Sequence, residues 1–194
     1  SNGLLAHLRG LRVEILDKRG QAELALEDLR WLAREAPAHA ETRARVAEAL
    51  DQSRITLDPA QSLERLRRMA DAGLVDRVEL ELSRLSGKHG RLVTPATVAY
   101  LKGRARQIAR IDQVAGAQWL ERAAELKHEN ASQLRIDAAR LYVREGEVQH
   151  AVRAYDRAAR SDPKRADEAA FYAARACAIL GEPRRGSERY TQFI

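Results

Sequence analysis

The stretch that decides the fold is residues 132–165, SQLRIDAARLYVREGEVQHAVRAYDRAARSDPKR. Small and aromatic residues and a proline follow a spacing of 3, 9, 4 and 8 residues in it, at Ala139, Tyr142, Ala151, Tyr155 and Pro163. The same spacing occurs near the start of the chain, at Val13, Leu16, Ala25, Leu29 and Pro37. In each copy a glycine, Gly146 or Gly20, lies at the same offset. The two stretches therefore represent one repeated structural unit.

This spacing predicts a pair of helices joined by a tight turn. A first helix of about 14 residues precedes a turn at glycine, and a second helix of similar length ends at a proline. Small residues such as Ala139 and Ala151 let the two helices approach closely, while Tyr142 and Tyr155 fill the space beside them. Because neither helix can bury its apolar stripe within one pair, we expect successive pairs to stack on one another.

The composition favours the same fold class. The chain contains 35 alanines and 29 arginines, which are strong helix formers, and only 5% aromatic residues. This leaves little material for a sheet, so a sandwich or a barrel is excluded. No apolar run approaches the roughly 18 residues that a membrane-spanning helix needs. We therefore expect a folded, all-helical chain without a membrane span.

Around the repeated positions the chain resembles the tetratricopeptide repeat family, whose unit is a helix-turn-helix of about 34 residues. Residues 132–165 are the clearest copy and residues 6–39 the next. A third copy starts near Asp167 and stops with the chain. Its matching residues are Ala174, Cys177, Gly181 and Tyr190, with Gly186 where alanine is usual. The resemblance implies an all-α fold, a right-handed solenoid of about 11 helices in antiparallel hairpins.

The repeat phase divides the chain into segments. We expect residues 1–5 to be a tag remnant and the end of a preceding segment, 6–57 to be N-terminal hairpins, 58–96 an irregular helical unit, and 97–194 C-terminal hairpins truncated in the last repeat. Pro37 and Pro163 lie 126 residues apart, which is not a whole number of periods, so the phase slips within the irregular unit. There the sequence predicts helices near 59–72 and 74–86, a loop at 87–90, and a helix start at Thr94 and Pro95.

The sequence contains only weak motifs for phosphate binding, metal binding or catalysis. Gly87 and Lys88 are followed by His89 rather than by Ser or Thr, so they do not make a phosphate-binding loop. The five histidines lack the spacing of zinc ligands, and the single cysteine, Cys177, lies in an apolar run typical of a buried position. Adjacent acids such as Glu27 and Asp28 are typical of a solvated helix face. We therefore expect no enzyme activity, no cofactor and no metal.

The excess of basic over acidic residues is unevenly distributed along the chain. Residues 1–96 carry a net charge of +1, and residues 97–194 carry +5. The resemblance implies a concave groove lined mainly by first helices, and in the last two units its positions fall on Gln133, Ile136, Asp137, Arg140, Val143, Arg144, Glu168, Phe171, Tyr172 and Arg175. In the 97–130 unit, Lys102, Arg106 and Arg110 share one face at i, i+4 spacing, opposite Leu101, Ala105 and Ile108. The corresponding N-terminal positions are acidic: Glu14, Asp17, Glu41, Glu48 and Asp51.

This polarity predicts that the basic end of the groove binds a carboxylate-rich segment of a partner protein, with Ile136 or Phe171 offering an apolar contact. The alternative is that arginine occupies every exposed helix face, where neighbouring acids and water solvate it. Trp31 and Trp119 have two interpretations as well: aromatic anchors for a partner, or packing between successive hairpins, which we favour.

The function expected from these features is a non-catalytic scaffold for protein binding. The alanine- and arginine-rich style resembles bacterial proteins, among them the periplasmic stalks of outer-membrane exopolysaccharide exporters. A cytoplasmic regulatory or assembly adaptor fits equally well, so the compartment stays open between periplasm and cytoplasm. A nucleic-acid-binding helical repeat is the rival from another class. The acidic first half and the scarcity of aromatics for base stacking count against it.

Overall fold

The computed structural model describes residues 2–88, 93–179 and 181–191. These residues form eleven α-helices and one short 3-10 helix, and the described ranges contain no strand. The chain divides into two compact units, residues 1–92 and 93–194. The predicted fold class, all-α with about 11 helices, is confirmed at this level.

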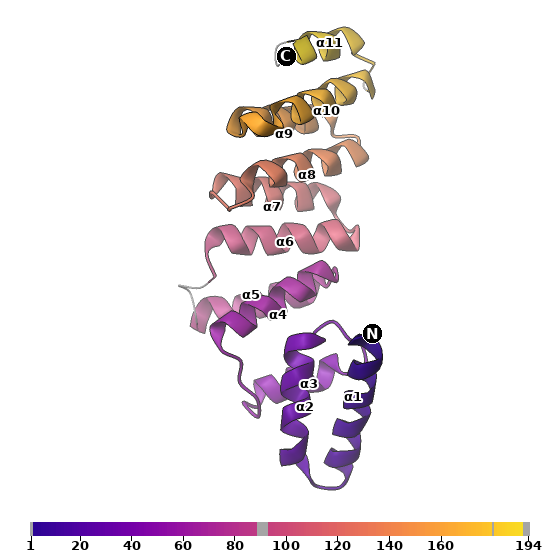
Figure 1. Cartoon of the computed structure of the whole chain (residues 1–194), viewed down its shortest axis with the longest axis vertical. Helices are drawn as coiled ribbons and strands as arrows, with labels where there is room; N and C mark the ends of the chain where they lie inside the picture. The colour runs from indigo at the N-terminus through magenta and orange to yellow at the C-terminus, as the bar shows by residue number, and fades with distance from the viewer. Residues whose placement is uncertain (1, 89–92, 180, 192–194) are drawn as a thin grey trace. The chain divides into compact units, whose positions relative to one another are not determined.

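Unit 1 contains the first five helices (Figure 1), which are α1 (Asn2–Lys18), α2 (Ala22–Glu35), α3 (Arg43–Asp51), α4 (Pro59–Asp71) and α5 (Val75–Lys88). Helices α1 and α2 pack on each other, and α2 also contacts α3 and α4. Residues 2–5, which we expected to be part of a tag remnant and the end of a preceding segment, belong to α1. The side chain of Asp58 accepts a hydrogen bond of 2.8 Å from the backbone N–H of Gln61, which fixes the start of α4.

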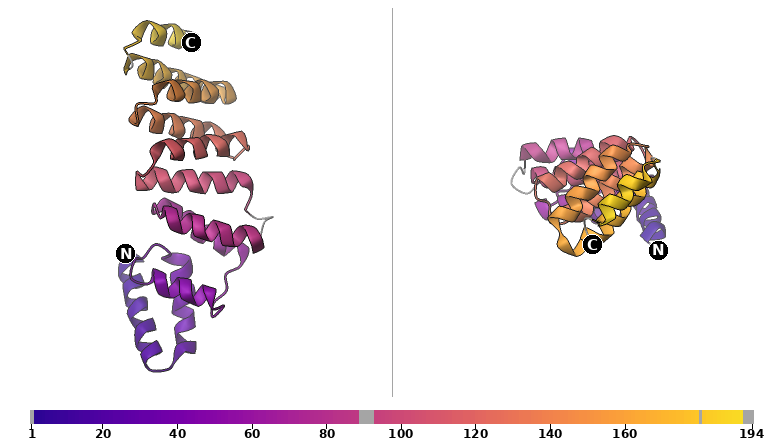
Figure 2. Two further views of the ribbon diagram at one scale, coloured as in Figure 1. Left: turned by 180° about the vertical axis from the view of Figure 1, so that it is seen from behind. Right: turned by 90° about the horizontal axis from the view of Figure 1, so that it is seen from above.

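Unit 2 is a stack of helices in which each one packs on the next along the chain (Figures 1 and 2). Its helices are α6 (Pro95–Ala109), α7 (Gln113–Glu125), α8 (Ala131–Arg144), α9 (Val148–Ser161), the 3-10 helix η1 (Pro163–Arg165), α10 (Ala166–Ile179) and α11 (Pro183–Thr191). One hydrophobic core runs through α6 to α10. Its alanines keep the helices close together, as the repeat spacing predicts.

The repeated positions are core positions in both units. Their side chains are at most 9% exposed at Val13, Leu16, Ala25, Leu29, Ala139, Tyr142, Ala151 and Tyr155. Gly20 and Gly146 have φ of +69° and +77°, the left-handed conformation that a turn between two helices needs and that glycine adopts without strain. The predicted helix, glycine turn and second helix are thus confirmed in both copies.

Glycine at position 186, where the resemblance predicts alanine, has a steric explanation. A Cβ atom at this position would lie 2.7 Å from the carbonyl oxygen of Ala174, because α11 approaches the backbone of α10. Cys177, on the same side of α10, is 1% exposed and packs as a small hydrophobic residue, as predicted.

Several predicted boundaries need correction. Helix α5 extends through Gly87 and Lys88, so the predicted loop does not start there, and its other residues, 89 and 90, lie outside the described ranges. The predicted start at Thr94 is confirmed, since its hydroxyl accepts a hydrogen bond of 3.2 Å from the N–H of Thr97. Ile108 was expected to face the core with Leu101, but it is 40% exposed.

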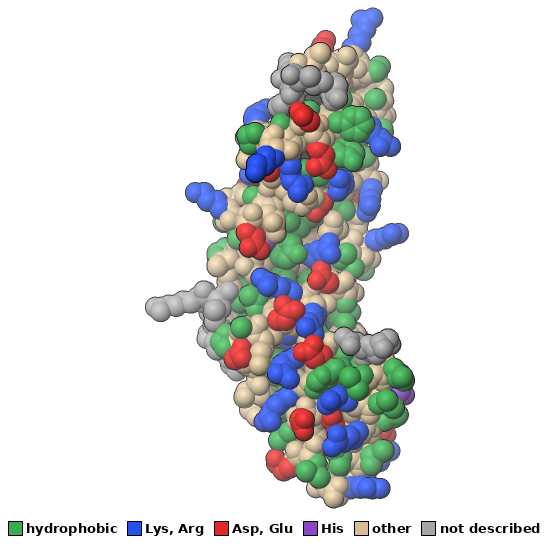
Figure 3. Space-filling view, in the orientation of Figure 1, with side chains coloured by type: hydrophobic (Ala, Val, Ile, Leu, Met, Phe, Trp, Pro, Cys, Tyr) green, Lys and Arg blue, Asp and Glu red, His purple; other side chains and the backbone are tan. Residues whose placement is uncertain are grey.

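The described surface mixes charges of both signs. Blue and red side chains alternate over much of the face seen in Figure 3, as expected for helices that pair arginine with nearby acids. None of the described helices is both long enough and apolar enough to cross a membrane.

Candidate functional site

Three of the predicted groove arginines line one pocket in unit 2. We call it the arginine pocket, and its lining consists of Arg140, Val143, Arg144, Tyr155, Tyr172, Arg175, Ala176 and Ile179. Its volume of about 400 Å³ is within the range of small ligand pockets. Its described lining contains three guanidinium groups and no carboxylate. This pocket is therefore a concavity that attracts anions.

Three consecutive helices position these residues. Arg140 and Arg144 are one turn apart on α8, so they lie on the same helix face. Helix α9 packs on both α8 and α10, and it contributes the buried Tyr155. The lining residues of α10 are spaced as one helical stripe, at positions 172, 175, 176 and 179.

The aromatic side of the pocket is well packed. Tyr155 is 2% exposed and stacks on Tyr172 with 5.8 Å between ring centroids and 21° between the ring planes. Burial is the main cause that raises the pKa of Tyr155 to about 12, and the nearby Arg140 partly opposes it. Phe171 meets Tyr172 edge to face at 5.5 Å. Tyr155 therefore stays uncharged at neutral pH and forms a rigid apolar wall.

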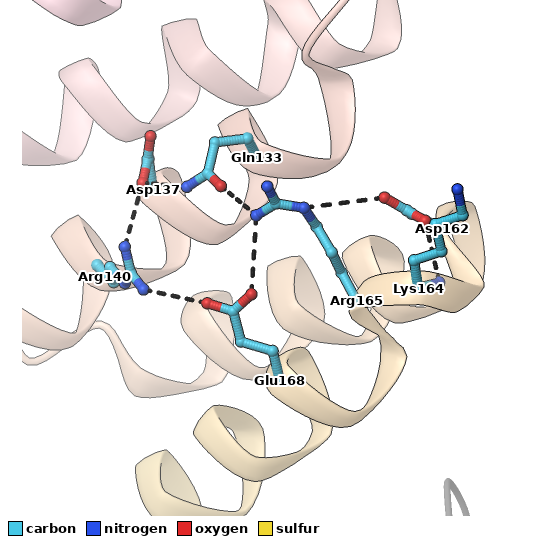
Figure 4. A network of polar contacts seen from close by, with 7 residues as sticks. All are labelled: Gln133, Asp137, Arg140, Asp162, Lys164, Arg165 and Glu168. Carbon is cyan, nitrogen blue, oxygen red and sulfur yellow. Dashed lines mark hydrogen bonds and ion pairs between the residues drawn. The ribbon is translucent and has the colours of Figure 1, made fainter.

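Arg140 is held in place by acids outside the lining (Figure 4). Its guanidinium donates hydrogen bonds to Asp137 at 3.5 Å and to Glu168 at 3.4 Å, and its carbon Cζ lies 5.2 Å from the centroid of the Tyr172 ring. Arg165 also contacts Glu168, at 3.7 Å, and donates to Gln133, which in turn donates to Asp137 at 2.9 Å. This network joins α8 to α10 and fixes the spacing of the pocket walls.

The other two arginines of the pocket are available to bind a ligand. Arg144 and Arg175 are exposed, and neither makes a hydrogen bond or ion pair with any part of the chain that the structure describes. The pocket thus combines one guanidinium that is fixed by Asp137 and Glu168 with two that are available to an anionic ligand.

The remaining predicted site residues are not brought into this pocket. Ile136 was expected to contact a partner, but it is 0% exposed. Helix α8 packs against both α7 and α9, so the buried surface of α8 covers more than one row of its side chains. Phe171 is 50% exposed, as a contact residue requires, yet it lies outside the pocket lining.

The predicted basic residues of α6 do not extend the pocket either. The Lys102 ammonium lies 4.6 Å from the centroid of the Trp119 ring, and Arg106 donates to the carbonyl of Lys102. Arg110 ends α6 with φ of +56°, so the i, i+4 relation that placed it on one face with Arg106 does not hold. Trp119 and Trp31 are partly buried and pack on the two core clusters, which supports the packing interpretation.

The predicted acidic end has a different geometry. Glu14, Asp17 and Glu48 line a smaller pocket in unit 1, about 190 Å³, which we call the paired-charge pocket; Lys18, Leu29, Arg45 and Arg54 complete its lining. Glu14 pairs with Lys18 at 2.8 Å and Arg45 at 3.4 Å, and Asp17 lies 3.7 Å from Arg54. Three acids and three bases balance, so the expected acidic surface is wrong for this pocket.

The other two predicted acids also have local partners. Glu41 lies 2.6 Å from a ring nitrogen of His7, and Asp51 pairs with Arg84 at 2.9 Å. Hydrogen bonding from Lys18 is the main cause that lowers the pKa of Glu14.

The two pockets occupy equivalent repeat positions. Four lining residues of one lie 126 residues from four of the other, the same offset that relates the repeated core residues: Glu14 and Arg140, Asp17 and Val143, Lys18 and Arg144, Leu29 and Tyr155. The repeat therefore places a concavity at the same point of each copy, and the side chains determine its charge.

Sequence inspection missed part of the site. Tyr155 was assigned only to the core, and Ala176, Ile179 and Arg165 were not considered. The i, i+3, i+4, i+7 spacing from Tyr172 to Ile179 was the available signal. Within the described ranges, no three His, Cys, Asp or Glu side chains are grouped as metal ligands would be.

Comparison with known proteins gives no family model, no curated protein and no solved structure that matches this chain.

Proposed function

We propose that the chain is a non-catalytic scaffold of the tetratricopeptide type, a right-handed solenoid of antiparallel hairpins within a bacterial protein, and that its arginine pocket binds an acidic segment of a partner protein. The observation that carries this proposal is the pocket lining itself, with three arginines, no carboxylate, and two guanidinium groups without a partner among the described residues. The repeated position of the two pockets supports the repeat architecture.

The surroundings of the arginines favour a peptide as the ligand. Val143 and Ile179 give the pocket an apolar edge beside its charges, and Ile179 is 61% exposed. A segment with alternating acidic and aliphatic side chains would place carboxylates on Arg144 and Arg175 and an aliphatic group against Ile179.

Nucleic acid fits the pocket less well. Binding of single strands relies on aromatic rings whose faces are open to bases. Here Tyr155 is 2% exposed, and Tyr172 already contacts Tyr155 and the guanidinium of Arg140. Both tyrosines are thus already in contact with other side chains, so the pocket offers charge but is poorly suited to stacking.

The test is fluorescence anisotropy with a labelled synthetic peptide that alternates Glu and Leu. Replacing Arg144→Glu and Arg175→Glu together removes both available guanidinium groups, and we expect the Kd of the peptide to rise by at least about tenfold, or 1.4 kcal/mol. The matched control is Arg160→Glu with Arg184→Glu, which makes the same change in net charge at exposed positions outside the pocket.

The control should keep the affinity of the native chain. Equal weakening by both pairs would show that only net charge matters, and an unchanged Kd in the pocket variant would refute the proposed site. A single-stranded oligonucleotide of the same charge serves as competitor. If it displaces the peptide at low salt and loses affinity steeply as salt rises, the nucleic-acid alternative is favoured.

A further inference from the structure

Helix α1 is apolar on two faces. One face enters the core of unit 1 through Ala6, Val13 and Leu16, which are 0%, 1% and 9% exposed. The other face carries four large aliphatic side chains that we call the leucine seam: Leu4, Leu8, Leu11 and Ile15, which are 63%, 53%, 44% and 51% exposed. Figure 3 shows hydrophobic side chains gathered over α1. A helix that is apolar on both faces is normally covered on both, so the seam lacks a partner among the residues that the structure describes.

The seam has the geometry of a helix-helix contact. Its residues are separated by 4, 3 and 4 positions, the spacing that puts side chains into the holes of a facing helix. It runs over most of α1, a helix of 17 residues. The surface therefore fits another helix with the same spacing better than it fits an extended peptide.

We propose that the leucine seam pairs with the same seam of a second copy of this chain, with the two α1 helices antiparallel about a twofold axis. The spacing 4, 3, 4 is the same in both chain directions. In the antiparallel register Leu8 faces Leu11 of the second copy, and Leu4 faces Ile15 of the second copy. All four seam positions of each copy are then filled by apolar partners, and the contact is closed by symmetry.

Charges beside the seam favour this direction over the parallel one. A parallel pair would place Lys18, the next seam position, against its own equivalent, and His7 beside Arg12 of the second copy. In the antiparallel pair Lys18 lies beyond the end of the contact, and His7 comes next to Glu14 of the second copy. Leu5, 41% exposed, then packs along the aliphatic part of Arg12.

A lipid surface fits the seam less well than a second copy. Helices that lie on membranes present a polar face opposite the apolar one, and basic residues on it attract anionic lipid. The face of α1 opposite the seam is instead the protein core. Glu14 lies next to Ile15 and Asp17 within the same turn, and both would oppose an anionic surface, which offsets the attraction of Arg12 and Lys18.

The inference is independent of the proposed peptide-binding function and is tested by the oligomeric state. Sedimentation equilibrium on the whole chain should show a monomer-dimer equilibrium in the range of about 1 to 100 µM. Replacing Leu8→Glu and Leu11→Glu places four carboxylates in the middle of the contact, and we expect the dimer Kd to rise by at least about a hundredfold. Both side chains are about half exposed, so circular dichroism should show an unchanged helix content.

The matched control is Leu80→Glu with Ile111→Glu, two exposed aliphatic residues outside the seam, and it should leave the dimer intact. Direction is tested with single cysteine variants. A mixture of Leu8→Cys and Leu11→Cys chains should form disulfide-linked dimers faster than Leu8→Cys alone. In the antiparallel register position 8 of one copy faces position 11 of the other, and position 8 does not face its own equivalent.

Four results would overturn the proposal. A chain that stays monomeric throughout the concentration range has no such contact. A dimer that survives Leu8→Glu with Leu11→Glu uses another surface. Faster linkage of Leu8→Cys with itself would establish the parallel direction, and monomers that bind vesicles of anionic lipid through the seam would assign it to a membrane.

Discussion

The arginine pocket and the paired-charge pocket occupy the same position of the repeat but differ in charge: the lining of the first is basic, and the lining of the second is balanced. Arg140, Val143, Arg144 and Tyr155 stand in one copy where Glu14, Asp17, Lys18 and Leu29 stand in the other. In unit 1 Glu14 and Asp17 each lie beside a base of the same pocket, and Glu48 accepts a hydrogen bond of 2.9 Å from Gln52. The three acids of this pocket are balanced by three bases, so little net charge is left for a ligand. In unit 2 Asp137 and Glu168 lie outside the lining, and Arg140 is the one pocket arginine that they contact among the described residues. The repeat determines where a concavity forms, and local ion pairing determines whether it carries a charge.

The largest expected effect concerns the shared core position behind each pocket. Tyr155→Ala and Leu29→Ala each remove a side chain that is 2% exposed, and each should lower the free energy of unfolding by about 3 to 4 kcal/mol. Urea denaturation followed by circular dichroism measures the loss. Tyr155→Phe, which keeps the ring, is the control and should retain most of the stability.

Similar losses in the two variants would show that the two repeat positions contribute equally to the free energy of unfolding, although their pockets differ in charge. A loss below about 1 kcal/mol at one position would break the equivalence, since truncation of a fully buried side chain of this size costs more than that.

An intermediate effect is expected from converting one pocket into the other. Glu14→Arg with Asp17→Val gives the paired-charge pocket the charge pattern of Arg140, Val143 and Arg144. We expect the doubly substituted chain to bind the acidic peptide about tenfold more tightly than its parent, because two of the three carboxylates are replaced while Lys18 is kept. Anisotropy is measured in chains that carry Arg144→Glu and Arg175→Glu, so that only the converted pocket contributes.

Absence of any gain would show that charge alone does not account for the difference between the two pockets.

The smallest effect concerns the titration of Glu14. Lys18 and Arg45 lower its pKa below 4.5, with the hydrogen bond from Lys18 as the main cause. Because the pKa is depressed in the folded chain, this carboxylate contributes stability at pH above its unfolded pKa, and the contribution is lost as pH falls through the folded pKa. A carbon-13 NMR titration should show the Glu14 pKa moving back toward 4.5 in Lys18→Met.

Arg19→Met, at the neighbouring position, is the control for a general loss of positive charge and should leave the Glu14 titration where it is. An equal shift in both variants would mean that the pairing with Lys18 does not set the pKa.

The sequence predicted the helices and the repeated core well, because apolar spacing is a local property of the chain. It also placed Arg140, Arg144 and Arg175 together, since the family's groove positions fall on one helix face in successive units. It failed for Ile136, because which side of a helix is covered depends on how many neighbours it has, and α8 lies between α7 and α9.

The charge state of the two pockets was beyond a sequence-based prediction. The spacing put Glu14, Asp17 and Glu48 on one surface but gave no sign that Arg45 and Arg54, from later segments, would lie against two of them. Arg110 shows a similar limit, because its left-handed backbone ends α6 one residue too early for the expected stripe.

The absence of carboxylates and histidines from the described lining of the arginine pocket has a consequence for its response to pH. Guanidinium groups stay protonated over the whole range in which proteins are folded, and the pKa of Tyr155 is about 12. The charge of the three guanidinium groups is therefore constant from mildly acidic to mildly alkaline conditions. Any proton dependence of binding would come from the ligand, so the pH profile of an interaction at this pocket would report the acidic groups of the partner and identify their type.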